Sequence, residues 1–327
     1  MFRRIVGPIL KVAVSAALIW LVVSNLDFSQ VWSRLSELSS SWLALALAML
    51  AIQYLLCAIR WRAVLDVLGA RIPLGRALSI FWMGTFFNQA LPSAVGGDAI
   101  RIYKLYKTGG SLGAAFNGVM LERGATVYAL ALIVAAMLPA LGQSVPDSDM
   151  TWIVPAVLGL VAIGTAGLGV VMLLDRLPAR HRRWRVVRGL AELAADARQV
   201  FLSPRNAFRV LGWAILGHVN LCMIPYALLV GIGDDVSYGA VLALYPLVVL
   251  ATTVPISIAG WGVREVSMIA AFALIGVSTE SATAVSLLLG VLTALASVPG
   301  GVLWLLDGRD ARAPAVPAMN GAQDGSP

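Results

Sequence analysis

Two segments of the sequence each place an arginine shortly after a proline and glycine break. Arginine suits this position chemically, because its planar guanidinium binds a phosphate or carboxylate through two hydrogen bonds. The first segment runs from Pro92 to Arg101 and the second from Pro255 to Arg264. At a constant offset, the two prolines, one glycine of each segment and the two arginines coincide. The residues predicted to break the helices are Pro92, Gly96, Gly97, Pro255, Gly260 and Gly262.

These arginines are predicted to face a protected site, because an arginine at the bilayer centre costs about 2.5–3.5 kcal/mol. The half-helices that restart near Asp98 and Gly262 would add free N–H groups and a positive helix end. This combination suits a phosphorylated headgroup. A structural ion-pair network without a ligand is the alternative. The predicted site residues are Arg101, Arg264, Arg123, Glu122, Glu265, Asn88, Gln89, Asp98 and Trp261.

Individual roles follow from the chemistry of each side chain. Glu265 is expected to pair with Arg101 or Arg123, because adjacent residues do not face each other on a helix. Glu122 would pair with another cation, and Asp98 would first serve as a helix N-cap. Trp261 could close the site against the lipid. The side-chain amides of Asn88 and Gln89 would satisfy the backbone at the first break or line the path of the ligand. Lys104 and Lys107 are expected to be anchors at the membrane interface.

The composition indicates a membrane protein with many spans. Of the 327 residues, 59% are hydrophobic and 13% are charged, whereas soluble domains contain about 45–50% apolar and 25% charged residues. Several apolar runs reach the roughly 20 residues that cross a bilayer. Cys57 and Cys222 lie in separate apolar spans, which makes a disulfide improbable, and the two histidines cannot form a metal site alone. No metal, cofactor or ATPase motif is predicted.

The order of elements predicts an all-α fold with about six full transmembrane helices. Residues 28–40 and 184–201 have the pattern of amphipathic helices at the membrane interface. Two interrupted apolar segments, about 77–107 and about 238–276, are predicted to be re-entrant helical hairpins. Residues 1–306 would form one membrane domain, and residues 307–327 a disordered cytoplasmic tail. The predicted spans are 5–24, 42–59, 112–141, 151–174, 210–230 and 281–306.

The charges between the spans predict the orientation. Nearly all the lysines and arginines fall on one side, including nine arginines in the loop 175–209, whereas the opposite loops are acidic and contain only Arg34 as a basic residue. The positive-inside rule then places both termini in the cytoplasm and the protein in the inner (plasma) membrane. The two hairpins consequently enter from opposite faces. This arrangement is typical of an inverted repeat, in which paired broken helices mark a transporter binding site.

Two groups of residues resemble a known family. They are the run from Asn88 to Arg101 with Leu121-Glu122-Arg123, and the run from Pro255 to Glu265. Both resemble the flippase-like membrane region of lysylphosphatidylglycerol synthases, over roughly residues 5 to 306. The resemblance implies a lipid-translocating module that is also found as stand-alone proteins. It does not imply lysyl transfer, because the aminoacyl-transferase domain is not expected in the few residues after the last span.

The sequence therefore predicts a lipid flippase or scramblase for an anionic or phosphate-bearing lipid, either a phospholipid or a polyprenyl-linked lipid. Membrane lipids with anionic headgroups would be its partners, and nucleic acid would not. Two alternatives remain at this stage. One is a non-catalytic accessory protein for a lipid- or glycan-modifying enzyme. The other is an integral-membrane transferase that uses the acidic pair Asp234 and Asp235.

Overall fold

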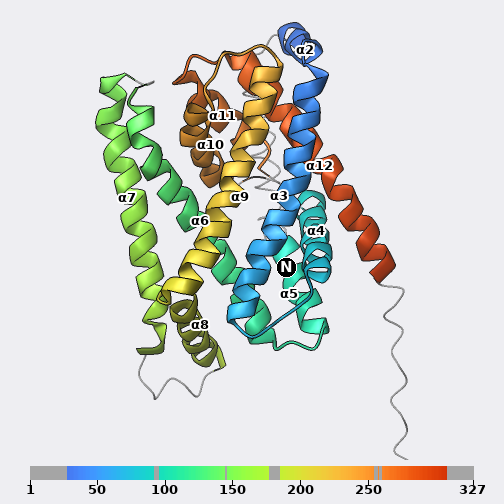
Figure 1. Cartoon of the computed structure of the whole chain (residues 1–327), viewed down its shortest axis with the longest axis vertical. Coiled ribbons are helices and arrows are strands. Elements are labelled where there is room, and N and C mark those ends of the chain that lie inside the picture. The colour runs from blue at the N-terminus through green and yellow to red at the C-terminus, as the bar shows by residue number, and fades with distance from the viewer. Residues whose placement is uncertain are drawn as a thin grey trace, which may run out of the picture.

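The computed structural model describes residues 28–91, 96–143, 146–176, 185–253, 257 and 260–307. Within these ranges the regular structure is entirely helical (Figure 1). The helices are α2 Phe28–Ser36, α3 Ser40–Val67, α4 Leu74–Ala90, α5 Gly96–Lys107, α6 Leu112–Leu141, α7 Asp147–Met172, the short 3-10 helix Leu174–Arg176, α8 Arg185–Phe201, α9 Pro204–Gly231, α10 Tyr238–Thr253, α11 Val263–Ala273 and α12 Thr279–Asp307.

Five of the described helices are long and apolar enough to cross a membrane: α3, α6, α7, α9 and α12. They confirm the multi-pass prediction. The predicted first span 5–24 and the predicted tail beyond residue 307 lie outside the described residues. α3 continues to Val67, past the predicted end at residue 59. Apolar residues still recur on one face there, and Ala58, Trp61 and Leu65 are fully or almost fully buried. This extension brings Arg60 into the helix.

α3 and α9 pack against each other at the centre of the molecule (Figure 1). Small residues allow the close approach, as is usual between membrane helices. A Cβ atom added to Gly217 would lie 3.5 Å from Nη1 of Arg60, and one added to Gly231 would lie 2.9 Å from Cβ of Trp42. The largest hydrophobic cluster joins this pair to α6, α7, α10, α11 and α12.

Two pairs of short helices flank the central pair. α4 and α5 pack together in the lower half of Figure 1, and α10 and α11 pack together in the upper half. α4 also packs against α12, and α10 packs against α6. The predicted breaks therefore do separate two short helices in each segment. Pro92 and Pro255 themselves lie outside the described residues.

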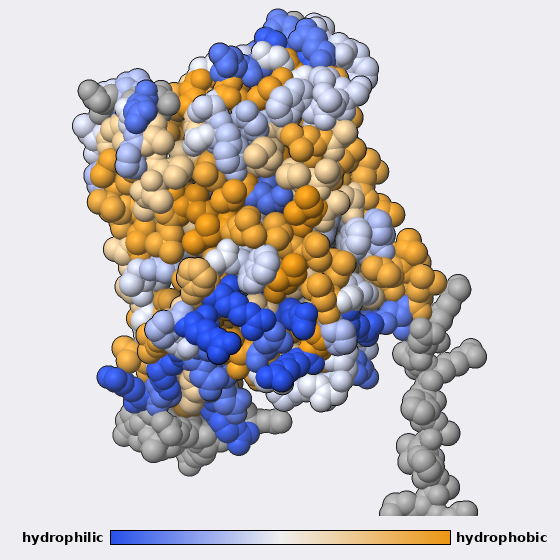
Figure 2. Space-filling view, viewed as in Figure 1, coloured by the Kyte–Doolittle hydropathy of each residue, from blue (hydrophilic) through white to orange (hydrophobic). Residues whose placement is uncertain are grey.

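The amphipathic helices α2 and α8 lie at opposite ends of the molecule (Figure 1). The apolar face of α8 buries Ala194, Ala197 and Val200, while Arg188 remains exposed. Figure 2 shows an apolar belt between the two ends and hydrophilic side chains gathered at the α8 end. These features are those expected of interfacial helices at the two edges of a membrane-embedded region.

Candidate functional site

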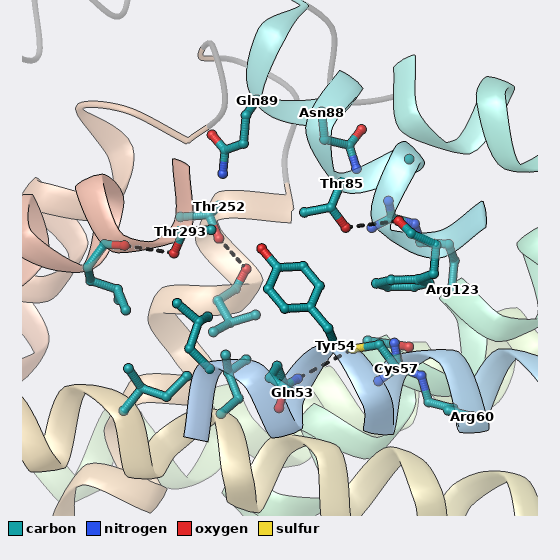
Figure 3. A pocket seen from close by; sticks show the side chains of 18 of the residues that line it. Gln53, Tyr54, Cys57, Arg60, Thr85, Asn88, Gln89, Arg123, Thr252 and Thr293 are labelled. Carbon is teal, nitrogen blue, oxygen red and sulfur yellow. Dashed lines mark hydrogen bonds between the residues drawn. The ribbon is translucent and has the colours of Figure 1, made fainter. Parts of the chain in front are cut away.

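A cavity of about 360 Å³ lies among α3, α4, α5, α6, α9, α10, α11 and α12 (Figure 3). Its size falls within the usual range of ligand pockets. One part of the wall is apolar, and the rest consists of amides, hydroxyls and charged groups. The charged residues that line it are Arg60, Arg101, Glu122, Arg123 and Arg264, and the uncharged polar ones include Gln53, Tyr54, Thr85, Asn88, Gln89, Thr252 and Thr293.

Glu122 of α6 is the centre of a buried ion-pair cluster. Its Oε1 accepts a hydrogen bond of 2.7 Å from Nε of Arg60 and a second bond from Nη2 of the same side chain. Its Oε2 accepts a bond of 3.0 Å from Nη2 of Arg101. All three residues are at most 5% exposed. The guanidinium of Arg101 also lies 4.5 Å from the ring centroid of Trp61, a cation–π distance.

Asp98 of α5 extends this cluster toward the cavity. Its two carboxylate oxygens accept bonds of 2.9 and 3.0 Å from Nε and Nη2 of Arg123, and Nη1 of Arg101 lies 3.4 Å away. The prediction that Asp98 caps the helix is wrong, because α5 already begins at Gly96 and the carboxylate faces the two arginines. The side chain of Arg123 is 43% exposed and is the most accessible arginine of the cluster.

Arg264 forms a second, smaller cluster. Its Nη2 donates to Oε1 of Glu265 at 2.7 Å, and its Nε donates to Oγ of Ser286 on α12 at 3.1 Å. The prediction that Glu265 reaches Arg101 or Arg123 is wrong. Glu265 turns back over the first turn of α11, where its Oε2 accepts a 2.6 Å bond from N of Gly262. Because the Glu265 carboxylate lies at the N-terminus of α11, the adjacent Arg264 can reach it.

Both restarting helices carry an internal acceptor at their N-terminus. The N–H of Gly97 donates to Oδ1 of Asn88 at 2.8 Å, and the N–H of Gly262 donates to Glu265. The expectation of free N–H groups is therefore wrong for these two residues. Asn88 satisfies the backbone at the break and also lines the cavity. The arginine side chains that line the cavity are groups available to an anion.

The Tyr54 hydroxyl is a polar group that lines the cavity. Tyr54 is 6% exposed, and its hydroxyl finds no hydrogen-bond partner among the described residues. Figure 3 shows the ring reaching from α3 into the space between Thr252, Gln89 and Thr85. A buried hydroxyl without a partner is costly. Its position in the cavity makes it a ready contact for a polar ligand.

The structure gathers most of the predicted site residues but not all of them. Arg101, Glu122, Arg123, Arg264, Asn88 and Gln89 line one cavity, whereas Asp98 and Glu265 contact it through arginines. The Trp261 ring lies beside Arg264, with its centroid 4.8 Å from the guanidinium carbon. Sequence reasoning missed Arg60 and Tyr54. The recurrence of Tyr54, Cys57, Arg60 and Trp61 on one helix face was the signal that could have revealed them.

Several other predicted groups have different partners. Lys104 donates to Oδ2 of Asp307 at 2.6 Å and does not line the cavity. Asp234 accepts a bond of 3.2 Å from Oγ of Ser281, and partial burial raises the pKa of its carboxyl. Cys57 and Cys222 are both free and buried. These contacts assign Lys104 and Asp234 to helix packing.

The fold and the cavity define a polytopic membrane protein with a buried cationic site. The chain belongs to the family of the lysylphosphatidylglycerol synthase TM region, whose sequence model matches residues 9–300. It is also 25% identical over 314 residues to a UPF0104 membrane protein of Methanothermobacter thermautotrophicus. The match covers 87% of each chain.

Proposed function

We propose that the protein moves an anionic, phosphate-bearing lipid, either a phospholipid or a polyprenyl-linked lipid, across the cytoplasmic membrane. The observation that carries the proposal is the set of four arginines that line one cavity among the membrane-span candidates. An arginine within a membrane requires an anion or a water-filled space. Membership of the family supports the assignment as a membrane module. The lipid substrate is our inference from the residues of the site.

The charges of the cavity suit one anionic headgroup. Four arginines, Arg60, Arg101, Arg123 and Arg264, face three carboxylates, those of Asp98, Glu122 and Glu265. One positive charge is left over, and a phosphodiester group would balance it. Arg123 and Arg264 are the residues that we assign to the headgroup. Glu122 and Glu265 would hold the arginines in place, and the apolar part of the wall would receive the start of the lipid chains.

We also propose that the chain is an inverted repeat within one membrane domain of residues 1–306. The two halves have matching elements in the same order. α3 and α9 contain 28 residues each, α4 and α5 contain 17 and 12, and α10 and α11 contain 16 and 11. α4 packs on α12 as α10 packs on α6. The short pairs would then be re-entrant hairpins from opposite faces, with both termini in the cytoplasm.

Replacing Tyr54 by phenylalanine separates a ligand role from a structural one. We expect the thermal unfolding midpoint to stay the same or to rise, because the lost hydroxyl has no hydrogen-bond partner among the described residues. We expect the translocation rate of a labelled phosphatidylglycerol or polyprenyl phosphate in proteoliposomes to fall by roughly fivefold, which corresponds to the loss of one hydrogen bond to the lipid. Arg123→Gln should lower the rate by about tenfold or more, since it removes a charged contact.

The control for this assay is Arg188→Gln, on the exposed face of α8, which should leave the rate unchanged. Wild-type protein that moves neither lipid would refute the proposed function. Normal rates for both Tyr54→Phe and Arg123→Gln would refute the proposed site.

Cysteine labelling from each side of the membrane tests the inverted repeat. The turns after α5 and α11 contain Gly109 and Gly276, whose φ angles of 94° and 78° disfavour a side chain. We therefore choose the exposed neighbours Lys107 and Thr279. A membrane-impermeant maleimide should label Lys107→Cys from the cytoplasmic side and Thr279→Cys from the other side. Labelling of both from the same side would exclude opposite hairpins.

A further inference from the structure

A second basic hollow lies at the α8 end of the molecule, away from the central cavity. It has a volume of about 340 Å³ and lies between the end of α3 and the start of α9, which are side by side. Three of its six lining residues are arginines and one is acidic. The residues are Arg62, Asp66, Val67, Arg71, Asn206 and Arg209.

Two of these arginines lack an anionic partner within the part of the chain that the structure describes. Nη2 of Arg209 donates to Oδ2 of Asp66 at 2.7 Å. Neither Arg62 nor Arg71 has a carboxylate within ion-pair distance among the described residues. Nε of Arg62 is buried and has no hydrogen-bond partner there. In the central cluster, by contrast, each arginine already has a carboxylate. The hollow thus has two more positive than negative charges.

The position of the hollow matches the level of lipid phosphates. Figure 1 places the end of α3 and the start of α9 next to α8, at the lower end of the helical bundle. Figure 2 shows that hydrophilic side chains at this end directly adjoin the apolar belt. Headgroups lie at this boundary, where anionic lipids attract basic residues. Val67 and the neighbouring apolar surface would accept the first part of a lipid chain.

We propose that Arg62, Arg71 and Arg209 bind the phosphate of an anionic phospholipid from the adjacent leaflet. Each guanidinium offers paired N–H donors to phosphate oxygens. The Asn206 amide adds an uncharged donor or acceptor for the rest of the headgroup. The site is separate from the central cavity, and the proposal does not depend on translocation.

Native mass spectrometry of the full chain can count lipids that stay bound after detergent release. The probes are phosphatidylglycerol, phosphatidylcholine and inorganic phosphate. We expect the wild type to retain one more phosphatidylglycerol than the Arg62→Gln/Arg71→Gln variant, whose affinity at this site should fall at least about tenfold. The single variant Arg71→Gln, at an exposed position, should show a smaller loss without disturbing the fold.

The matched control is Arg188→Gln/Arg205→Gln, which removes two exposed arginines from the same end of the molecule. It should retain the wild-type number of lipids. Arg123→Gln alters the central cavity alone. Its effect on lipid retention should add to that of Arg62→Gln/Arg71→Gln, as expected for distant sites. An unchanged lipid count in the Arg62→Gln/Arg71→Gln variant would overturn the proposal. Equal retention of phosphatidylcholine, or displacement of the lipid by millimolar phosphate, would also overturn it.

Discussion

The Glu122→Gln variant is expected to lose about 3–5 kcal/mol of its free energy of unfolding, because the change leaves two buried arginines without their main counter-charge. Arg60 has no other carboxylate partner among the described residues, and Arg101 keeps only the longer contact with Asp98. Denaturant unfolding in detergent micelles, followed by circular dichroism, measures the loss. Lipid translocation should fall with it, because the arginines lose their fixed positions.

The double variant Arg60→Gln/Glu122→Gln tests the cause. It should be less destabilised than the sum of the two single changes, because the buried charge and its partner are removed together. The exposed pair of Arg34 and Glu37, with an N···O distance of 3.6 Å, provides the control. Glu37→Gln should change the free energy of unfolding by less than about 1 kcal/mol. Additive effects of Arg60→Gln and Glu122→Gln would contradict this account of the cluster.

The Gly97→Ala variant is expected to lose about 3 kcal/mol or more, at the upper end of the range for overpacking. A Cβ atom at this position would collide with the carbonyl oxygen of Gly84 and lie 2.6 Å from Oδ1 of Asn88. The backbone of Gly84 cannot move away from the added Cβ atom as a flexible side chain could. The change would push α5 away from α4 and displace Arg101, whose Cγ lies against Gly84.

Gly75 provides the matched control for this change, because it lies in α4 and an added Cβ would meet nothing within 4 Å. Gly75→Ala should be neutral or stabilising by up to about 1 kcal/mol, since alanine favours the helix. Thermal unfolding midpoints of the two variants, measured side by side in the same detergent, give the comparison. Equal midpoints would show that α4 and α5 are not packed as closely as described.

Local sequence patterns were sufficient to predict most of the helices. The predicted span 112–141 coincides with α6, and the predicted amphipathic segment 184–201 differs from α8 by one residue. The two breaks were also predicted, because proline and glycine interrupt a helix through the backbone itself. Each of these features depends on residues within a few turns of one another, and the sequence displays that information directly.

Tertiary structure decided the charge pairs that join different helices. Arg60 and Glu122 are 62 residues apart, so no local pattern connects them. The two internal acceptors are closer in sequence to their partners: Glu265 is three residues from Gly262, and Asn88 is nine residues from Gly97. By itself the sequence determined an apolar, multi-span chain with two broken segments and arginines beside them. Only packing determined the partners of Glu122, because its carboxylate bonds to the arginines that the neighbouring helices α3 and α5 bring within reach.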